Sequence, residues 1–182
     1  MLCQIDSQFL YPWYTQQYSL KKSLKHRISP PEVYERIKVD NNSFAAWLRH
    51  LPLKEAGTQV MLYNGRAKNR QDVHEAVVDI DIGGRDLQQC ADAVIRLRSE
   101  YLYARKRFDD ISFHFTNGQL IAYIEWRKGK KIAFKNNRAQ WIQTNNNQTD
   151  YSSFRKYNNL IFAYAGTYSL SKNMHPVVNL NN

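Results

Sequence analysis

The chain has 182 residues, of which 43% are hydrophobic and 13% aromatic, and it carries a formal net charge of +10. This composition excludes a disordered chain, and the length is sufficient for one domain with its own core. No run approaches the about 20 apolar residues that cross a bilayer, so we predict no membrane span. The polar interruptions near the N-terminus exclude a continuous signal-peptide core, which predicts a cytoplasmic location for the chain as written.

The N-terminal residues show few signs of regular structure up to a Pro-Pro pair, so we predict a poorly ordered leader over residues 1–30. Residues 32–39 predict a short strand. A short helix is then expected to begin near Asn42 or Ser43, both good N-cap residues, and to end before a Leu-Pro-Leu segment.

Two strands are predicted around the dipeptide Asn64-Gly65, the strongest hairpin signal in the chain. The first covers residues 58–63 and the second residues 73–82. Alternation in the second strand places His74 on the same face as several apolar side chains, so we expect it to point inward.

Residues 79–90 indicate a strand, a glycine turn and the start of a helix that carries Cys90. Asp86 is a good N-cap and Gln89 can complete a capping box, which predicts a helix over residues 87–103 with Cys90 at its fourth position. The backbone N–H groups and dipole at a helix start favour thiolate over thiol, so a reactive cysteine is one interpretation.

Helical spacing offers a second interpretation of the same cysteine. One face is predicted to hold Leu87, Cys90, Ala91, Val94, Tyr101 and Leu102, and the opposite face Arg96, Ser99 and Glu100. A free cysteine on an apolar helix face is more often a small buried hydrophobe than a nucleophile.

The C-terminal half predicts short strands and one further helix. Residues 111–116, a turn at Asn117-Gly118 and residues 119–126 indicate a hairpin or a strand followed by a helical turn, with another short element near Trp141. Asp150 can cap a helix over residues 151–165. We therefore predict an α+β fold, with a small mixed or antiparallel sheet and a central helix starting near Leu87.

The sequence gives little support for a metal or a cofactor, and we expect neither. With Cys3 and Cys90 as the two cysteines, no Cys/His spacing predicts zinc. Asp79 and Asp81 lie two residues apart and suit a divalent cation, but a solvated pair beside Arg85 is the interpretation that we favour.

Four segments resemble a bacterial family known as domain of unknown function 4846, common in Bacteroidetes. They are residues 43–53 (SFAAWLRHLPL), 71–79 (QDVHEAVVD), 85–93 (RDLQQCADA) and 164–167 (YAGT). The resemblance covers residues 31–171, and residues 172–182 depart from it as a divergent tail. It implies that members continue for about another hundred residues beyond the end of this chain, so we expect residues 31–171 to be an incomplete domain.

The order of motifs in that family looks like the papain-like arrangement of NlpC-type cell-wall amidases. The resemblance implies that Cys90 is the nucleophile and that the general base is a histidine on a Gly-His-Ala strand beyond this chain. His175 does not match that motif. A thiol nucleophile needs a positioned base, so we expect this chain to be inactive and its relatives, which can include exported proteins, to act on cell-envelope amides.

Two residues within the chain could complete a site around Cys90. His74 precedes the predicted helix and is a candidate base, although an extended strand would place it far from the cysteine. Gln89 could donate to an oxyanion, but capping is its simpler role.

A different class of function remains open, that of a basic module binding an anionic polymer such as nucleic acid or an acidic glycan. Its candidate contacts are Tyr101, Arg105, Lys106 and Arg107. A solvated basic face without any ligand is the more common reason for such a cluster, so nucleic acid is not the expected partner. A non-catalytic structural protein is the third possibility, and the sequence does not fix an oligomeric state.

Overall fold

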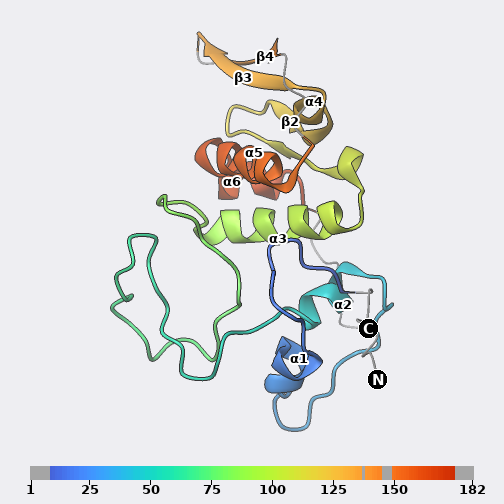
Figure 1. Cartoon of the computed structure of the whole chain (residues 1–182), viewed down its shortest axis with the longest axis vertical. Coiled ribbons are helices and arrows are strands. Elements are labelled where there is room, and N and C mark those ends of the chain that lie inside the picture. Colours follow the sequence, from blue (N-terminus) through green and yellow to red (C-terminus); the bar gives the residue numbers. More distant parts are fainter. Residues whose placement is uncertain (1–8, 137, 145–148, 175–182) are drawn as a thin grey trace. The chain divides into compact units, whose positions relative to one another are not determined.

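The computed structural model describes residues 9–136, 138–144 and 149–174. It divides the chain into two compact units, Met1–Asp86 and Leu87–Asn182. The described residues form six α-helices and two separate two-stranded antiparallel sheets, which confirms the predicted α+β class (Figure 1). Within these ranges, no helix has the length and apolar character needed to span a membrane.

The regular elements of the first unit are short helices. They are the 3-10 helix η1 (Leu20–Lys22), α1 (Leu24–Arg27) and α2 (Phe44–Arg49). Ser43 caps α2, because its hydroxyl accepts a hydrogen bond from the Ala46 N–H at 3.1 Å. The predicted start of this helix is therefore confirmed.

An aromatic cluster forms the core of the first unit and includes part of the predicted leader. The Tyr11 ring packs against Trp13 and Trp47, and its hydroxyl donates to the Trp47 carbonyl at 2.8 Å. Trp13 Nε1 donates to the Asp79 carbonyl at 2.8 Å. The predicted leader over residues 1–30 therefore includes aromatic side chains that pack in this core from Phe9 onward. Residues 1–8 lie outside the described part.

The strands predicted over residues 32–39, 58–63 and 73–82 are wrong. The Asn64-Gly65 turn does form, with Gly65 at φ +78°. The residues after this turn pair with those just before it, since the Lys68 N–H donates to the Val60 carbonyl at 2.9 Å, and residues 73–82 are not the partner. Residues 73–82 contribute one isolated bridge, Leu53 to Val78. A segment with alternating side chains does not form a strand unless a neighbouring segment pairs with its backbone.

The second unit contains both of the sheets that the described residues form. Its elements are α3 (Cys90–Ala104), η2 (Phe108–Asp110), β1 (Ser112–His114), β2 (Leu120–Ala122), α4 (Tyr123–Arg127), β3 (Lys130–Lys135), β4 (Arg138–Gln143), α5 (Tyr151–Tyr164) and α6 (Thr167–Ser171). β1 and β2 pair with Phe113 opposite Ile121, and Gly118 adopts φ +86° in the intervening turn. Of the two predicted alternatives, the hairpin is confirmed, and the short helix α4 follows it directly.

Helix α5 organises the core of the second unit, because it packs against both α3 and α4 (Figure 1). Asp150 caps it as predicted, accepting from the Ser153 N–H at 2.6 Å. Phe154 and Tyr157 are fully buried, and the Tyr157 hydroxyl donates to the Ile121 carbonyl at 2.7 Å. α5 therefore ties the central helix to the first hairpin.

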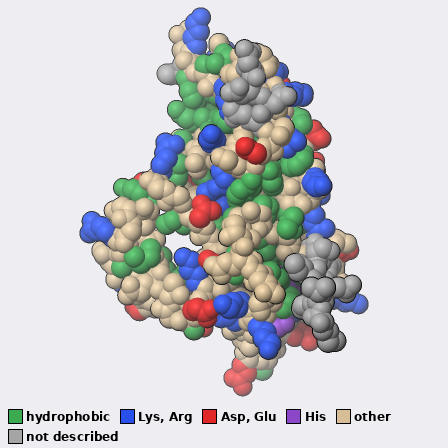
Figure 2. Space-filling model, viewed as in Figure 1, with side chains coloured by type: hydrophobic (Ala, Val, Ile, Leu, Met, Phe, Trp, Pro, Cys, Tyr) green, Lys and Arg blue, Asp and Glu red, His purple; other side chains and the backbone are tan. Residues whose placement is uncertain are grey.

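Basic side chains are spread over the face of the molecule drawn in Figure 2 and are interspersed with acidic and apolar ones. Several of them form ion pairs, such as Lys128 and Lys130 with Glu125 in the second unit. The net charge of +10 is therefore not concentrated in one patch on that face.

Candidate active site around Cys90

Cys90 is the first residue of α3 and its side chain is exposed. The predicted N-cap, Asp86, is wrong, because the helix begins three residues later than expected and Gln89 is its N-cap. The Asp92 carboxylate accepts from the Gln89 N–H at 3.2 Å and so completes the reciprocal cap at the helix start. The exposed position removes the interpretation of Cys90 as a buried core residue.

The predicted inward face of α3 is correct for Tyr101 and Leu102, which are buried, but wrong nearer the start of the helix. Val94 is 43% exposed, whereas Arg96, Ser99 and Glu100 have almost no exposed surface. The helix thus turns a polar stripe toward the core of the second unit. Such a stripe is stable only when its charges and hydrogen-bonding groups are satisfied internally.

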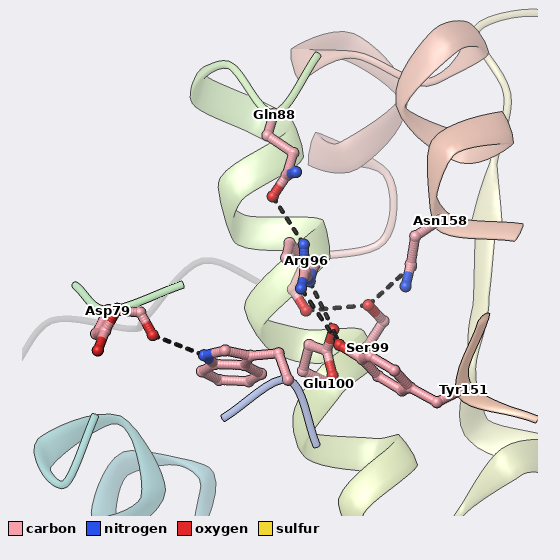
Figure 3. A network of polar contacts seen from close by, with 8 residues as sticks. Asp79, Gln88, Arg96, Ser99, Glu100, Tyr151 and Asn158 are labelled. Carbon is pink, nitrogen blue, oxygen red and sulfur yellow. Dashed lines mark hydrogen bonds and ion pairs between the residues drawn. The ribbon is translucent and has the colours of Figure 1, made fainter. Parts of the chain in front are cut away.

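An ion pair lies at the centre of this stripe (Figure 3). Arg96 Nε donates to Glu100 Oε1 at 2.6 Å, one helical turn along α3. The Tyr151 hydroxyl, from the first turn of α5, donates to the same Glu100 oxygen at 2.8 Å and lies 3.4 Å from Arg96 Nη2. Burial and the neighbouring Glu100 charge raise the pKa of Tyr151 well above its usual value, so this hydroxyl stays protonated.

The same arginine holds the turn that precedes Cys90. Arg96 Nη1 donates to Gln88 Oε1 at 3.0 Å (Figure 3), and Gln88 has a left-handed backbone at φ +64°. A residue other than glycine rarely adopts that conformation without support from its surroundings. The buried ion pair is therefore linked through one side chain to the backbone two residues before the thiol.

Ser99 and Asn158 extend the network to the middle of α5. The Ser99 hydroxyl lies 2.9 Å from Asn158 Oδ1 and 3.0 Å from the Arg96 carbonyl, and both side chains are fully buried. The Asn158 Nδ2 group makes no hydrogen bond within the described part of the chain. These contacts fix α5 against α3 by polar as well as apolar packing.

Burial also affects the carboxylate at the start of α3. It raises the pKa of Asp92 above its ordinary value, while hydrogen bonds from the backbone N–H groups of Gln89 and Gln88 lower it in part. Two consecutive backbone groups before Cys90 are therefore held by one side chain of the first helical turn. The loop before the cysteine is fixed from two directions, by Asp92 and by Arg96.

His74, the candidate base within the chain, belongs to the first unit, whereas Cys90 belongs to the second. Its Nε2 lies 3.2 Å from the Thr58 carbonyl, and its buried Nδ1 has no hydrogen-bond partner among the described residues. The ring lines a cavity of about 290 Å³ together with Glu55 and Glu75. Pairing of His74 with Cys90 stays a prediction.

The residues of the alternative basic site lie around the C-terminal end of α3. Tyr101 is buried, with the guanidinium groups of Arg98 and Arg105 at 5.7 and 5.6 Å from its ring centre. Lys106 is exposed and left-handed at φ +57°, and Arg107 pairs with Asp110 at 2.6 Å. The buried ring of Tyr101 is therefore not presented for stacking on a polymer.

Sequence patterns gave no indication of Arg96, Glu100 and Tyr151 as parts of a site. The spacing of Arg96 and Glu100, four residues apart, permits an ion pair on a helix, but the same spacing is typical of exposed helix surfaces. Within the described ranges, no group of three or more histidine, cysteine or acidic residues could hold a metal ion. Cys3 and His175 lie outside those ranges.

Comparison with known families supplies one match. A family model described as "Domain of unknown function (4846)" matches residues 24–182. The chain belongs to this family. The match is wider than the predicted range of 31–171 at both ends and includes the residues expected to form a divergent tail. No curated protein and no solved structure matches the chain.

Proposed function

We propose that this member of the family carries the nucleophile of a cysteine-dependent amide hydrolase, with Cys90 as the attacking group and cell-envelope amides as the substrate class. One observation carries the proposal: Cys90 is exposed at the first position of α3, after a turn that buried side chains hold in place. A nucleophile must be both accessible and oriented, and this position meets both requirements.

In the proposed reaction, Cys90 Sγ bonds to the carbonyl carbon of the amide and the carbon–nitrogen bond breaks. The amine leaves with the proton that the thiol gives up, and water then cleaves the thioester to an acid and the free thiol. Backbone N–H groups in the first turn of α3 have no carbonyl partner inside the helix, so they can stabilise negative charge on sulfur or on the carbonyl oxygen. Gln89 lies next to the thiol and is a further candidate donor.

The proposed reaction requires a proton acceptor beside Cys90. A papain-like relationship implies a histidine on a Gly-His-Ala strand, and His74 is the candidate among the described residues. The buried Nδ1 of His74 has no hydrogen-bond partner among the described residues and is available to accept a proton. We therefore propose thiol chemistry at Cys90, with amide turnover wherever a base is positioned beside the thiol.

An acylating probe tests the proposal. Peptidoglycan stem-peptide analogues with an activated C-terminal ester require the nucleophile but less of the base, because their leaving group needs no proton. Mass spectrometry should find one acyl group, attached to Cys90, in the wild-type chain and in Cys3→Ser, and none in Cys90→Ser. Acylation spread over lysine residues, or retained in Cys90→Ser, would refute the proposal.

A further inference from the structure

The first unit contains a cavity of about 400 Å³ that is lined by basic side chains from three segments. Lys25 comes from α1, Arg36 and Lys38 come from the stretch between α1 and α2, and Arg49 comes from the last turn of α2. His50, directly after α2, completes the basic lining. None of the described residues that line this cavity is acidic.

The four lysine and arginine side chains differ from two other basic residues of the same unit, since Lys22 pairs with Glu55 and Arg70 pairs with Asp72. In the described part of the chain, the four cavity residues form no ion pair. Arg36 donates to the Ile28 carbonyl and Arg49 to the Ile37 carbonyl at 2.8 Å, so most of the five N–H donors of each guanidinium remain available.

Like charges held together without counter-charges destabilise the folded state unless an anion compensates them. The same positive charges act on His50. Burial lowers the pKa of His50 and the hydrogen bond to the Ala46 carbonyl raises it, while the charges of Lys25, His26 and Arg49 lower it further. The unit thus maintains a cluster of positive charge around a concave space. An anion that bound there would offset this repulsion.

The size and lining of the cavity narrow the class of anion. Ile37 and Val39 add apolar surface beside the charges, which suits a ligand with an organic part as well as an anionic group. Two guanidinium and two ammonium groups exceed what one carboxylate can neutralise, whereas a dianionic phosphate accepts several charge-assisted hydrogen bonds at once. We infer that this cavity binds a small phosphorylated molecule through Lys25, Arg36, Lys38 and Arg49, independently of the proposed chemistry at Cys90.

Calorimetric titration of the full chain with pyrophosphate at low ionic strength tests the inference. The variant Lys25→Gln/Lys38→Gln removes two exposed charges that hold no described hydrogen bond, so its fold should be unchanged. We expect it to weaken binding by about tenfold or more. The matched control, Arg66→Gln/Lys68→Gln, removes two exposed charges of the same unit outside the cavity and should stay within about twofold of the wild type.

Further arms separate phosphate recognition from unspecific charge attraction. Arg49→Lys keeps the charge but loses the planar fork, so we expect it to weaken pyrophosphate binding more than the control does. Citrate, a polycarboxylate, should bind less tightly than pyrophosphate. Absence of pyrophosphate binding, equal losses in the cavity and control variants, or tighter binding of citrate would each overturn the inference.

Discussion

At the residue scale, the ion pair of Arg96 and Glu100 dominates the second unit, because both side chains are at most 1% exposed. Two charges removed from water are tolerated only while each neutralises the other. The pair also reaches Gln88 and Tyr151, so one interaction connects α5 to the turn before Cys90. Its loss should therefore affect both stability and the geometry of the cysteine.

We predict that Arg96→Met lowers the free energy of unfolding by about 3–5 kcal/mol, because it leaves the buried Glu100 carboxylate without its partner. Urea denaturation followed by tryptophan fluorescence measures the loss. Arg96→Met/Glu100→Leu removes both charges and should recover much of the stability. A single variant that is as stable as the wild type, or a double variant that is no more stable than the single one, would show that the ion pair does not stabilise the second unit in this way.

His50 gives the first unit a predictable dependence on pH. Its pKa in the folded state lies below the ordinary value of 6.5, mainly because the ring is buried, stacked on Phe9 at 3.9 Å between ring centres. The unfolded state therefore binds more protons below pH 6.5, so stability should fall as pH decreases from the ordinary pKa to the lowered one.

Chemical denaturation at about pH 8 and about pH 5 measures this effect, since the histidine changes charge between them in the unfolded chain. His50→Gln should lose less stability on acidification than the wild type does. His26→Gln is the comparison variant. The His26 ring contacts the Ser23 hydroxyl and is not part of the stacked pair of Phe9 and His50. Equal acid sensitivity of the wild type and His50→Gln would contradict this assignment.

At the element scale, the predicted helices and turns that proved correct depend on local chemistry. Ser43 and Asp150 cap the helices that follow them, and Gly118 supplies a positive φ in a tight turn. These signals act within a few residues, so the sequence is enough to recognise them. For α5, both the predicted first residue, Tyr151, and the predicted N-cap, Asp150, are confirmed.

The predictions were wrong where the structure depends on distant partners. Residues 73–82 alternate like a strand, but they form one isolated bridge, between Val78 and Leu53, and no ladder. Arg96, Ser99 and Glu100 look like the solvent face of α3, and only the approach of Tyr151 and Asn158 from α5 explains their burial. Hydrophobic spacing assigns every charged residue to the exposed face of a helix. A charged side chain is nevertheless buried when a residue from another element pairs with it.

We predict that Asp150→Ala lowers stability by about 1 kcal/mol, because the carboxylate caps the Ser153 N–H at the start of α5. Helical circular dichroism during urea denaturation provides the measurement. Asp150→Asn retains an acceptor and should restore most of the loss. If Ala and Asn are equally destabilising, charge at the helix start rather than hydrogen bonding explains the effect.

At the scale of the whole molecule, the charge of +10 makes a polyanion the main rival to an amide substrate. Tyr101 is buried and the exposed Arg107 is paired with Asp110, which leaves Lys106 as the exposed basic residue of the cluster without an ion pair among the described residues. We therefore expect weak binding of a polyanion, with little of that binding coming from this cluster.

Retention on heparin or single-stranded DNA, eluted with salt, measures that attraction. Reversing the charges of Arg105, Lys106 and Arg107 to glutamate should lower the eluting salt concentration no more than the same reversal at Arg66, Lys68 and Arg70, three exposed basic residues of the first unit. Selective loss of retention in the first variant would favour the basic module over the proposed thiol chemistry.

The fold places Cys90 at an exposed helix start, and we propose that the buried Arg96 orients it through Gln88. The rate of carbamidomethylation of Cys90 in a Cys3→Ser chain, compared between native buffer and urea near neutral pH, tests it most directly. Because the helix start and its fixed turn exist only in the folded state, we predict faster reaction in the native chain and a smaller difference in Gln88→Ala. A thiol that reacts more slowly when folded, or equally fast in both states, would show that the start of α3 does not activate Cys90.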